Sequence, residues 1–178
     1  MGGPPTNVTA LHLRNFIDGA WVEATGNDAF EDSDPATGEL IATVTKSNVE
    51  DVRQAVEAAR RAADGWRLTP APKRGEILYR AGELMLRRKE ELARAMTREM
   101  GKVLAETRGD VQEGIDMTYY CAGEGRRQFG DVVPAELPDK WAMSMRQPLG
   151  VVAAITPWNF PFAIPTWKLM PALVLGNT

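Results

Sequence analysis

The chain of 178 residues has one cysteine, Cys121, and one histidine, His12. A single histidine argues against a multi-histidine metal site and a histidine-centred catalytic triad, so we expect no bound metal. A single cysteine excludes an internal disulfide. Because no basic segment followed by an apolar run opens the sequence, we expect a reducing, cytoplasmic location.

Long apolar runs and an excess of one charge are also missing. No segment reaches the roughly 20 apolar residues that a membrane-spanning helix needs. The formal net charge is -3 and the pI is near 5.3, which gives no general attraction to nucleic acid or anionic lipid. Basic clusters such as Arg87-Arg88-Lys89 have acidic neighbours and are typical of solvated helix faces. We therefore expect neither nucleic acid nor a membrane as a partner.

Several common catalytic and nucleotide-binding motifs are absent. The sequence contains no Gly-x-Gly-x-x-Gly, no P-loop and no Gly-x-Ser-x-Gly. What is present is a globular composition, with 44% hydrophobic and 25% charged residues. A chain of this size and balance can bury a real core.

The first part of the chain predicts short strands. Residues 1–13 show no periodic pattern, and we expect a loose lead-in there. Asp18-Gly19 separates two short apolar runs, which is a strong signal for a two-residue hairpin. A second strand pair is predicted at 30–32 and 40–44, around the turn-rich segment 34–38. We expect these strands to form one small antiparallel β element.

From Ser47 the apolar period changes from that of strands to that of helices. Ser47 with Glu50, or Asn48 with Asp51, offers a capping arrangement for a helix that reaches Trp66 and packs on something larger. Further helical stretches are predicted around 77–85, at 90–100 before Gly101, and from about 103 to 129.

Residues 132–148 predict exposed strands. Two prolines punctuate the segment, and Trp141, Met143 and Met145 alternate with smaller or polar residues. Large apolar groups on such an arm leave a strand edge that favours a partner. Two interpretations follow: an exposed strand arm that pairs with a partner, or a plain surface hairpin.

The last part of the chain predicts a strand, a tight loop and a helix. Residues 151–156 are apolar or β-branched without alternation, which is typical of a parallel strand buried on both faces. Pro157 stops the strand, and the apolar stretch 162–175 is long enough for a helix. Asn159 stands where an N-cap belongs. Its amide also lies at the carboxyl end of a strand, where α/β sheets bind ligands, so it could instead donate to an oxyanion.

A long ordered series of residues in this region resembles the aldehyde dehydrogenase superfamily. The series reads Pro148-Leu149-Gly150-Val151-Val152, then Ile155-Thr156-Pro157-Trp158-Asn159-Phe160-Pro161, then Trp167-Lys168 and Pro171-Ala172-Leu173, and closes with Gly176-Asn177-Thr178. The similarity extends back to Phe16-Ile17-Asp18-Gly19. It covers nearly the whole chain but only the first portion of the family's sequence.

The resemblance implies an α/β fold that is incomplete in this chain. The expected parts are a small antiparallel β element, long helices, oligomerisation strands and the first βα unit of a parallel Rossmann-like sheet. We divide the chain into the lead-in at 1–13, the helical and β part of the cofactor-binding domain at 14–131, the oligomerisation arm at 132–148, and the first βα unit at 149–178.

The resemblance also implies a chemistry. In this family a cysteine thiolate attacks an aldehyde, an asparagine side chain and a backbone N–H hold the oxyanion, and hydride passes to NAD or NADP. A glutamate then helps to hydrolyse the thioester. Carried onto this sequence, Asn159 is the catalytic oxyanion donor. The expected cofactor-binding residues are Ile155, Thr156, Pro157 and Trp158, and the expected substrate-binding residues are Phe160, Ile164 and Trp167.

Alternatives remain for these positions. Trp158, Phe160, Ile164 and Trp167 could be packing groups. Lys168 matches a family position close to the active site, but it could also be a solvated charge on the helix.

Other family elements are absent from the sequence. The family nucleophile lies in a Gly-Gln-x-Cys setting, and the only thiol here is Cys121 on an expected helix, where we predict a buried, inert group. The Glu-Leu-Gly-Gly segment with the catalytic glutamate and the Lys-Pro run that holds the adenosine ribose are missing too. We expect activity to belong to a homo-oligomeric full-length parent and the isolated chain to be inactive.

The substrate class is less defined. Glu124-Gly125-Arg126-Arg127 has some similarity to semialdehyde-oxidising members, whose substrates carry a carboxylate that an arginine can bind. An alternative function is a non-catalytic interaction fragment that pairs with full-length subunits through the arm.

Overall fold

The computed structural model describes residues 10–178, and the first nine residues of the predicted lead-in lie outside this range. The end of the lead-in is not loose, because Leu11–Leu13 form strand β1. Strand β1 pairs in parallel with β5 (Leu40–Thr45), and β4 (Ala29–Ser33) pairs antiparallel on the other side of β5. The lead-in prediction was wrong here because β1 pairs with a strand about thirty residues away, which its own local pattern does not show.

The predicted hairpin is confirmed. Strands β2 (Asn15–Ile17) and β3 (Ala20–Val22) pair antiparallel around Asp18 and Gly19. Both turn residues have positive φ angles, 54° and 77°, as in the turns that match the twist of two-residue hairpins. This hairpin forms a sheet separate from β1-β5-β4. The expectation of one antiparallel element is therefore corrected to two sheets, one of which contains a parallel pair.

Helix α1 (Val49–Leu68) begins at the second of the two predicted capping arrangements. The side chain of Asn48 accepts hydrogen bonds from backbone N–H groups of the first turn, and Asp51 accepts one from the backbone of Asn48 at 2.7 Å. The bond from Asn48 is the main reason why the pKa of Asp51 lies below its usual value. The apolar stripe is left exposed at Val49 and Val52. The predicted packing of this helix on a larger body is seen near its end. There Trp66 Nε1 donates to the main-chain oxygen of Leu173, in the last helix of the chain, at 2.9 Å.

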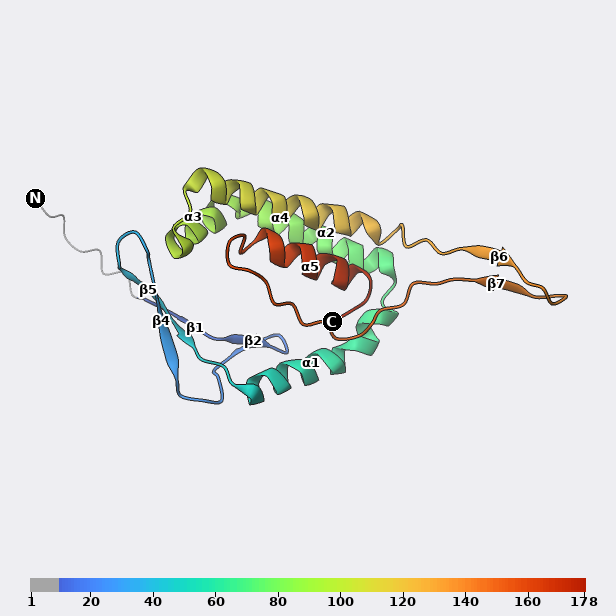
Figure 1. The fold of residues 1–178 in the computed structure, drawn as a ribbon, viewed down its shortest axis with the longest axis horizontal. Helices are drawn as coiled ribbons and strands as arrows, with labels where there is room; N and C mark the ends of the chain where they lie inside the picture. The colour runs from blue at the N-terminus through green and yellow to red at the C-terminus, as the bar shows by residue number, and fades with distance from the viewer. Residues whose placement is uncertain (1–9) are drawn as a thin grey trace, which may run out of the picture.

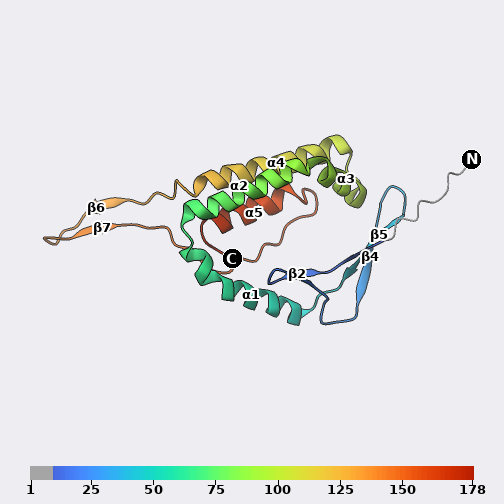
Figure 2. The ribbon, with the colours of Figure 1, turned by 180° about the vertical axis from the view of Figure 1, so that it is seen from behind.

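Four further helices form the main body of the molecule. They are α2 (Ala71–Arg87), α3 (Lys89–Met100), α4 (Leu104–Glu124) and α5 (Ala163–Val174). Figures 1 and 2 show α5 lying along α4 and α2, with α3 at one end of the group. Among residues 10–178, none of the helices combines the length and apolar character needed to cross a membrane.

Helix α4 ends five residues earlier than the expected boundary at 129. Gly125 terminates it, and a Cβ at this glycine would lie 2.5 Å from the carbonyl oxygen of Ala71. A Cβ at Gly75 would lie 2.4 Å from the carbonyl oxygen of Ala122. The glycines therefore allow the backbones of α2 and α4 to approach closely, and the end of α4 is determined by this packing.

The core consists of two apolar clusters that share α4. One joins α2, α4 and α5 through Leu78, Cys121, Met170 and Val174. The other joins α3 and α4 through Ala93, Met96, Val111 and Ile115. Helix α4 contributes to both clusters and is therefore the element on which the others pack.

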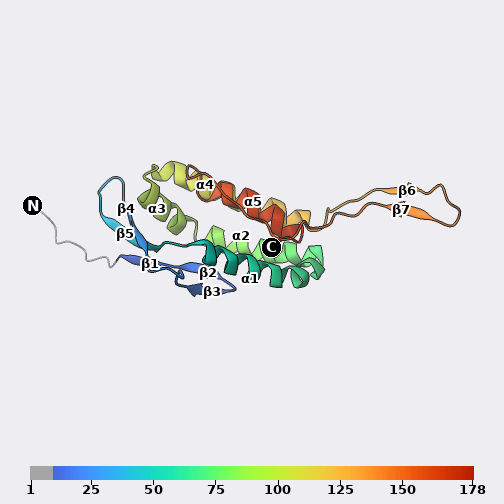
Figure 3. The same cartoon turned by 60° about the horizontal axis from the view of Figure 1, so that its bottom comes forward.

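The arm is a two-stranded antiparallel hairpin. Strands β6 (Val132–Pro134) and β7 (Trp141–Met143) pair with each other and project away from the helices (Figures 1 and 3). Both strands are exposed along their whole length, including Val132, Trp141 and Met143. The hairpin was predicted, whereas its use in oligomerisation stays a prediction.

Candidate functional site

The segment before the site is extended but is not the buried strand expected at 151–156. Its residues are largely exposed, and Ile155 is 99% exposed. Thr178 donates its N–H to Gly150 O at 3.0 Å and accepts from Val152 N–H at 2.7 Å. These two bonds flank Val151 as in a parallel ladder. The prediction of burial on both faces was wrong because, among the described residues, Thr178 alone supplies ladder bonds to this segment and no helix covers its full length.

Asn177 fixes the start of this segment. Its side-chain oxygen accepts from the N–H groups of Leu149 and Gly150 at 2.7 and 3.0 Å, and its amide donates to Ala172 O at 3.0 Å. Asn177 is buried, so these bonds are shielded from water. The residue therefore connects the extended segment with the end of α5.

Asn159 is not the N-cap of α5. The helix starts at Ala163, and its first N–H donates to Asp110 Oδ1 on α4 at 2.8 Å. This carboxylate, 53 residues away in the sequence, provides the acceptor that we had assigned to Asn159. The N-cap prediction was wrong for that reason. Because Asp110 caps the helix, the exposed side chain of Asn159 takes no part in capping.

A pocket of about 590 Å³ lies beside Asn159. It is lined by Lys102, Glu106, Gly109, Asp110, Glu113, Asn159 and Phe160. Lys102 Nζ donates to the main-chain oxygen of Asn159 at 2.7 Å and lies 4.0 Å from the centre of the Phe160 ring. Sequence reasoning missed Lys102 and Asp110, because the residues that they contact in the loop and at the start of α5 are more than 50 positions away.

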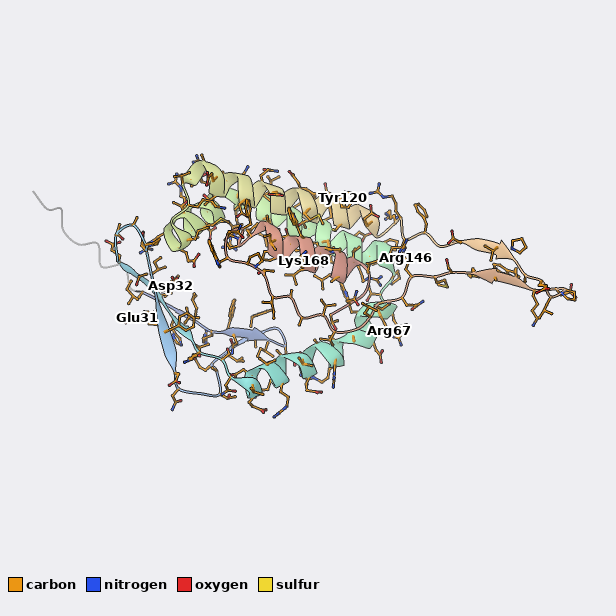
Figure 4. All side chains as sticks on the ribbon, in the orientation of Figure 1. Glu31, Asp32, Arg67, Tyr120, Arg146 and Lys168 are labelled. Atoms are coloured by element: carbon orange, nitrogen blue, oxygen red, sulfur yellow. The ribbon has the colours of Figure 1, made fainter. Side chains whose placement is uncertain are left out.

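The other predicted site residues are distributed along the extended segment, the loop and α5. Phe160 lines the pocket with Asn159, whereas Ile164 and Trp167 lie on α5 and do not line it. Trp158 is exposed in the extended segment. Lys168 is exposed on α5, where Figure 4 labels it. The structure thus places Asn159 and Phe160 at one pocket, and the roles given to all of these residues stay predictions.

Cys121 is a buried thiol in the middle of the core. It is 2% exposed and packs with Leu78, Met170 and Val174. Burial, with a smaller contribution from Glu124, raises the pKa of this thiol to about 11. Such a group is a poor nucleophile at neutral pH, and it packs against the second half of α5, whereas Asn159 precedes the first. Within residues 10–178, no group of three metal-binding side chains is found.

The fold and the strand-loop-helix site define a class of protein. Residues 21–178 match the model of the aldehyde dehydrogenase family, and the chain belongs to that family. It contains the α/β fold of the family in incomplete form.

Individual relatives agree with this assignment. The alpha-ketoglutaric semialdehyde dehydrogenase of Bacillus subtilis is 46% identical over 165 residues, which cover 92% of this chain and 34% of that protein. The crystal structure of an NADP dependent enzyme from E. coli has a TM-score of 0.90 at 39% identity, covering 94% of this chain and 35% of the other. An NAD-dependent aldehyde dehydrogenase from Sinorhizobium meliloti has a TM-score of 0.90 at 33% identity, covering 95% and 34%. The chain therefore spans about a third of the length of the relatives that it matches.

Proposed function

We propose that this chain supplies the oxyanion-binding asparagine to an NAD(P)-dependent aldehyde dehydrogenase. The reaction is the oxidation of an aldehyde to a carboxylic acid, and the substrate class is a semialdehyde. The semialdehyde class is supported by the similarity to the alpha-ketoglutaric semialdehyde dehydrogenase of Bacillus subtilis.

The proposal rests on the exposure of the Asn159 side chain and on its freedom from a capping role. Its carboxamide is exposed next to a pocket and is not used to cap α5, because Asp110 does so. Its main-chain oxygen is held by Lys102. An amide NH2 in a fixed loop can donate to negative charge that develops on a reacting carbonyl oxygen, and this kind of stabilisation is among the largest contributions to enzymatic rates.

The proposed cofactor segment fits one wall of a dinucleotide site. Ile155 and Trp158 are exposed, and this extended segment leads directly into the loop with Asn159. Such side chains can lie against the faces of a bound nucleotide. NAD or NADP, when bound, supplies the acceptor for hydride. Ile155, Thr156, Pro157 and Trp158 would contact it.

The attacking thiolate is not provided by Cys121, which is buried and has a raised pKa. We therefore assign catalytic activity to a full-length enzyme that contains this chain. The isolated chain is expected to form no NADH or NADPH from aldehydes.

The test is substitution of Asn159 in the full-length enzyme. Asn159→Ala should lower the rate of acylation, seen as the pre-steady-state burst of NAD(P)H, by about 100- to 1,000-fold. Asn27→Ala, which changes an exposed loop asparagine before β4, is the matched control and should keep the wild-type burst. An unchanged burst in Asn159→Ala would contradict the proposal.

A second candidate function is favoured by the exposed arm. The apolar side chains of Val132, Trp141 and Met143 leave β6 and β7 with surface that a second subunit could cover. The chain could then act as a non-catalytic fragment that pairs with full-length subunits. Light scattering of the mixture should show a mixed complex that Trp141→Lys weakens, and finding only free chain would remove this candidate.

A further inference from the structure

Two charged residues outside the predicted site contact the loop that carries Asn159. Lys102 follows Gly101, whose left-handed conformation (φ 80°) ends α3, so the lysine lies in the short turn before α4. Asp110 lies two turns into α4. Neither residue was assigned a role in the reaction above.

The ammonium group of Lys102 contacts three partners. It donates to Asn159 O at 2.7 Å, lies 3.7 Å from Asp110 Oδ2 and lies 4.0 Å from the centre of the Phe160 ring. The lysine side chain is only 14% exposed. Because water competes weakly at such a site, each of these interactions is stronger than at an exposed surface. The head group is therefore held in one place.

Asp110 explains why a cation is needed there. Its side chain is fully buried, and while Oδ1 accepts from Ala163 N–H, Oδ2 has no hydrogen-bond partner among the described residues. A buried carboxylate is costly unless a nearby charge compensates it. The Lys102 ammonium supplies that charge, and Asp110 in turn keeps the ammonium next to the loop.

Together the two side chains fix both ends of one short segment. Lys102 binds the carbonyl of Asn159, and Asp110 binds the N–H of Ala163. The bond from Lys102 to the carbonyl of Asn159 limits rotation of the main chain at this residue. Because the side chain is attached to that main chain, the bond also limits the directions in which the exposed carboxamide can point.

We infer that Lys102 is a positioning residue for the oxyanion-binding amide of Asn159, and that Asp110 holds Lys102 in place. The inference rests on the proposed function, because it assigns a purpose to the orientation of Asn159. Lys102 does not touch the reacting atoms in this role. Its loss should lower the rate only through Asn159, and a displacement of about 1 Å in such a group can cost about 100-fold.

The experiment uses the full-length enzyme and the Lys102→Met variant, which keeps the linear side chain but removes the charge and the donor. Acylation is followed as the NAD(P)H burst, the affinity for NAD(P)+ by calorimetry, and folding by the thermal midpoint. Lys89→Met is the matched control, because Lys89 also reaches α4, where it donates to Gln112 at 2.7 Å without contacting the loop. The same Lys102 substitution is also made in the Asn159→Ala background.

We expect Lys102→Met to slow acylation about 10- to 100-fold with little change in NAD(P)+ affinity. In the Asn159→Ala background the same substitution should have no further effect, because the group that it positions is gone. Lys89→Met should keep the wild-type rate. A Lys102→Met enzyme as fast as Lys89→Met, or a loss that persists undiminished without Asn159, overturns the inference.

Two further comparisons keep the outcome decisive. If Lys102→Met does not fold, Lys102→Arg takes its place: it keeps a cation for Asp110 but changes the length of the side chain, and its smaller rate loss should also vanish without Asn159. The proposed function has its own test: it is contradicted if the Asn159→Ala enzyme keeps the wild-type burst. Loss of the burst in Asn159→Ala but not in the Lys102 variants overturns only the positioning role.

Discussion

Arg74 Nε donates to the main-chain oxygen of Val174 at 2.9 Å, which connects the start of α2 with the end of α5. The same guanidinium binds the carbonyls of Arg67, at 3.2 Å, and Thr69, near the end of α1. Arg74 is 5% exposed, and burial lowers the pKa of its guanidinium. An arginine nevertheless stays charged at neutral pH, and a cation is favourable at the carbonyl ends of helices. Arg74 therefore holds the last turns of two helices on the first turn of a third.

Replacing Arg74 should destabilise the chain strongly. Arg74→Met removes a charged donor from the carbonyls of Arg67, Thr69 and Val174, of which, among the described residues, only that of Val174 keeps another side-chain donor, Gln128 Nε2 at 2.9 Å. Because a hydrogen bond to a charged group contributes about 1.5 to 3 kcal/mol, we expect a loss of about 3 kcal/mol. The measurement is urea unfolding followed by circular dichroism. Arg60→Met, at an exposed arginine of α1, is the control and should change stability by less than about 0.5 kcal/mol. Equal midpoints for the two variants would show that the Arg74 contacts contribute little.

Two glycines of α4 should respond in opposite ways to alanine. A Cβ at Gly114 would lie 2.5 Å from Phe162 Cδ1, just before α5, whereas a Cβ at Gly109 meets nothing within 4 Å. Gly114→Ala must displace the ring and should cost about 1 to 3 kcal/mol. Gly109→Ala should stabilise by about 0.5 to 1 kcal/mol, because alanine loses less backbone entropy in a helix. Urea midpoints test the pair, and a stabilising Gly114→Ala would contradict the tight packing of Phe162.

Cys121 should react slowly in the folded chain. With a pKa of about 11, roughly one thousandth of this thiol is ionised at pH 8, compared with about a quarter of an ordinary cysteine. Burial slows reagent access further. Alkylation by iodoacetamide should therefore be at least about 100-fold slower in buffer than in 8 M urea, where the same single thiol serves as its own control. Similar rates in the two solutions would mean that the thiol is accessible.

Glu90 should make the stability of the folded chain depend on pH under acidic conditions. Hydrogen bonding to Arg108, at 2.7 Å, is the main reason why the pKa of Glu90 falls to about 2, and Arg94 adds to it. A carboxylate with a lowered folded-state pKa stabilises the fold above its ordinary value near 4.5, and this contribution disappears as the pH falls toward 2. The difference in urea midpoint between wild type and Glu90→Gln should therefore be largest near pH 6 and shrink below pH 4.

The control for this prediction is Arg108→Gln. Without the arginine, the folded-state pKa of Glu90 should lie closer to its usual value, and substituting Glu90 should matter less at every pH. A difference that is constant from pH 6 to pH 3 would exclude the ion pair as its cause.

Local rules explain which elements were predictable. Asp18-Gly19 forms its turn because two adjacent residues with positive φ suit a hairpin, and Asn48 with Asp51 begins α1 because both supply oxygens at the right spacing. Gly101 ends α3 in the left-handed conformation that glycine adopts easily. In each case the interacting groups lie within a few residues of one another.

The boundary of α4 and the start of α5 were not predictable in this way. Residues 125–129 are compatible with a helix, but α4 ends where Gly125 meets the backbone of α2 at Ala71. Asn159 is a good capping residue by composition, yet Asp110 on another helix takes the position. Competition between a local and a distant partner is decided by packing.

The sequence by itself therefore determined the family, the short-range turns and caps, and the identity of the amide proposed to bind the oxyanion. Only the tertiary structure decided that Asn159 is not a cap and that Lys102 and Asp110 hold its loop. The reason is that their contacts join residues 57 and 53 positions apart, and such contacts exist only after α3, α4 and α5 have packed. A buried carboxylate with one unpaired oxygen and a lysine facing it cannot be found from spacing, because burial is a property of the folded chain.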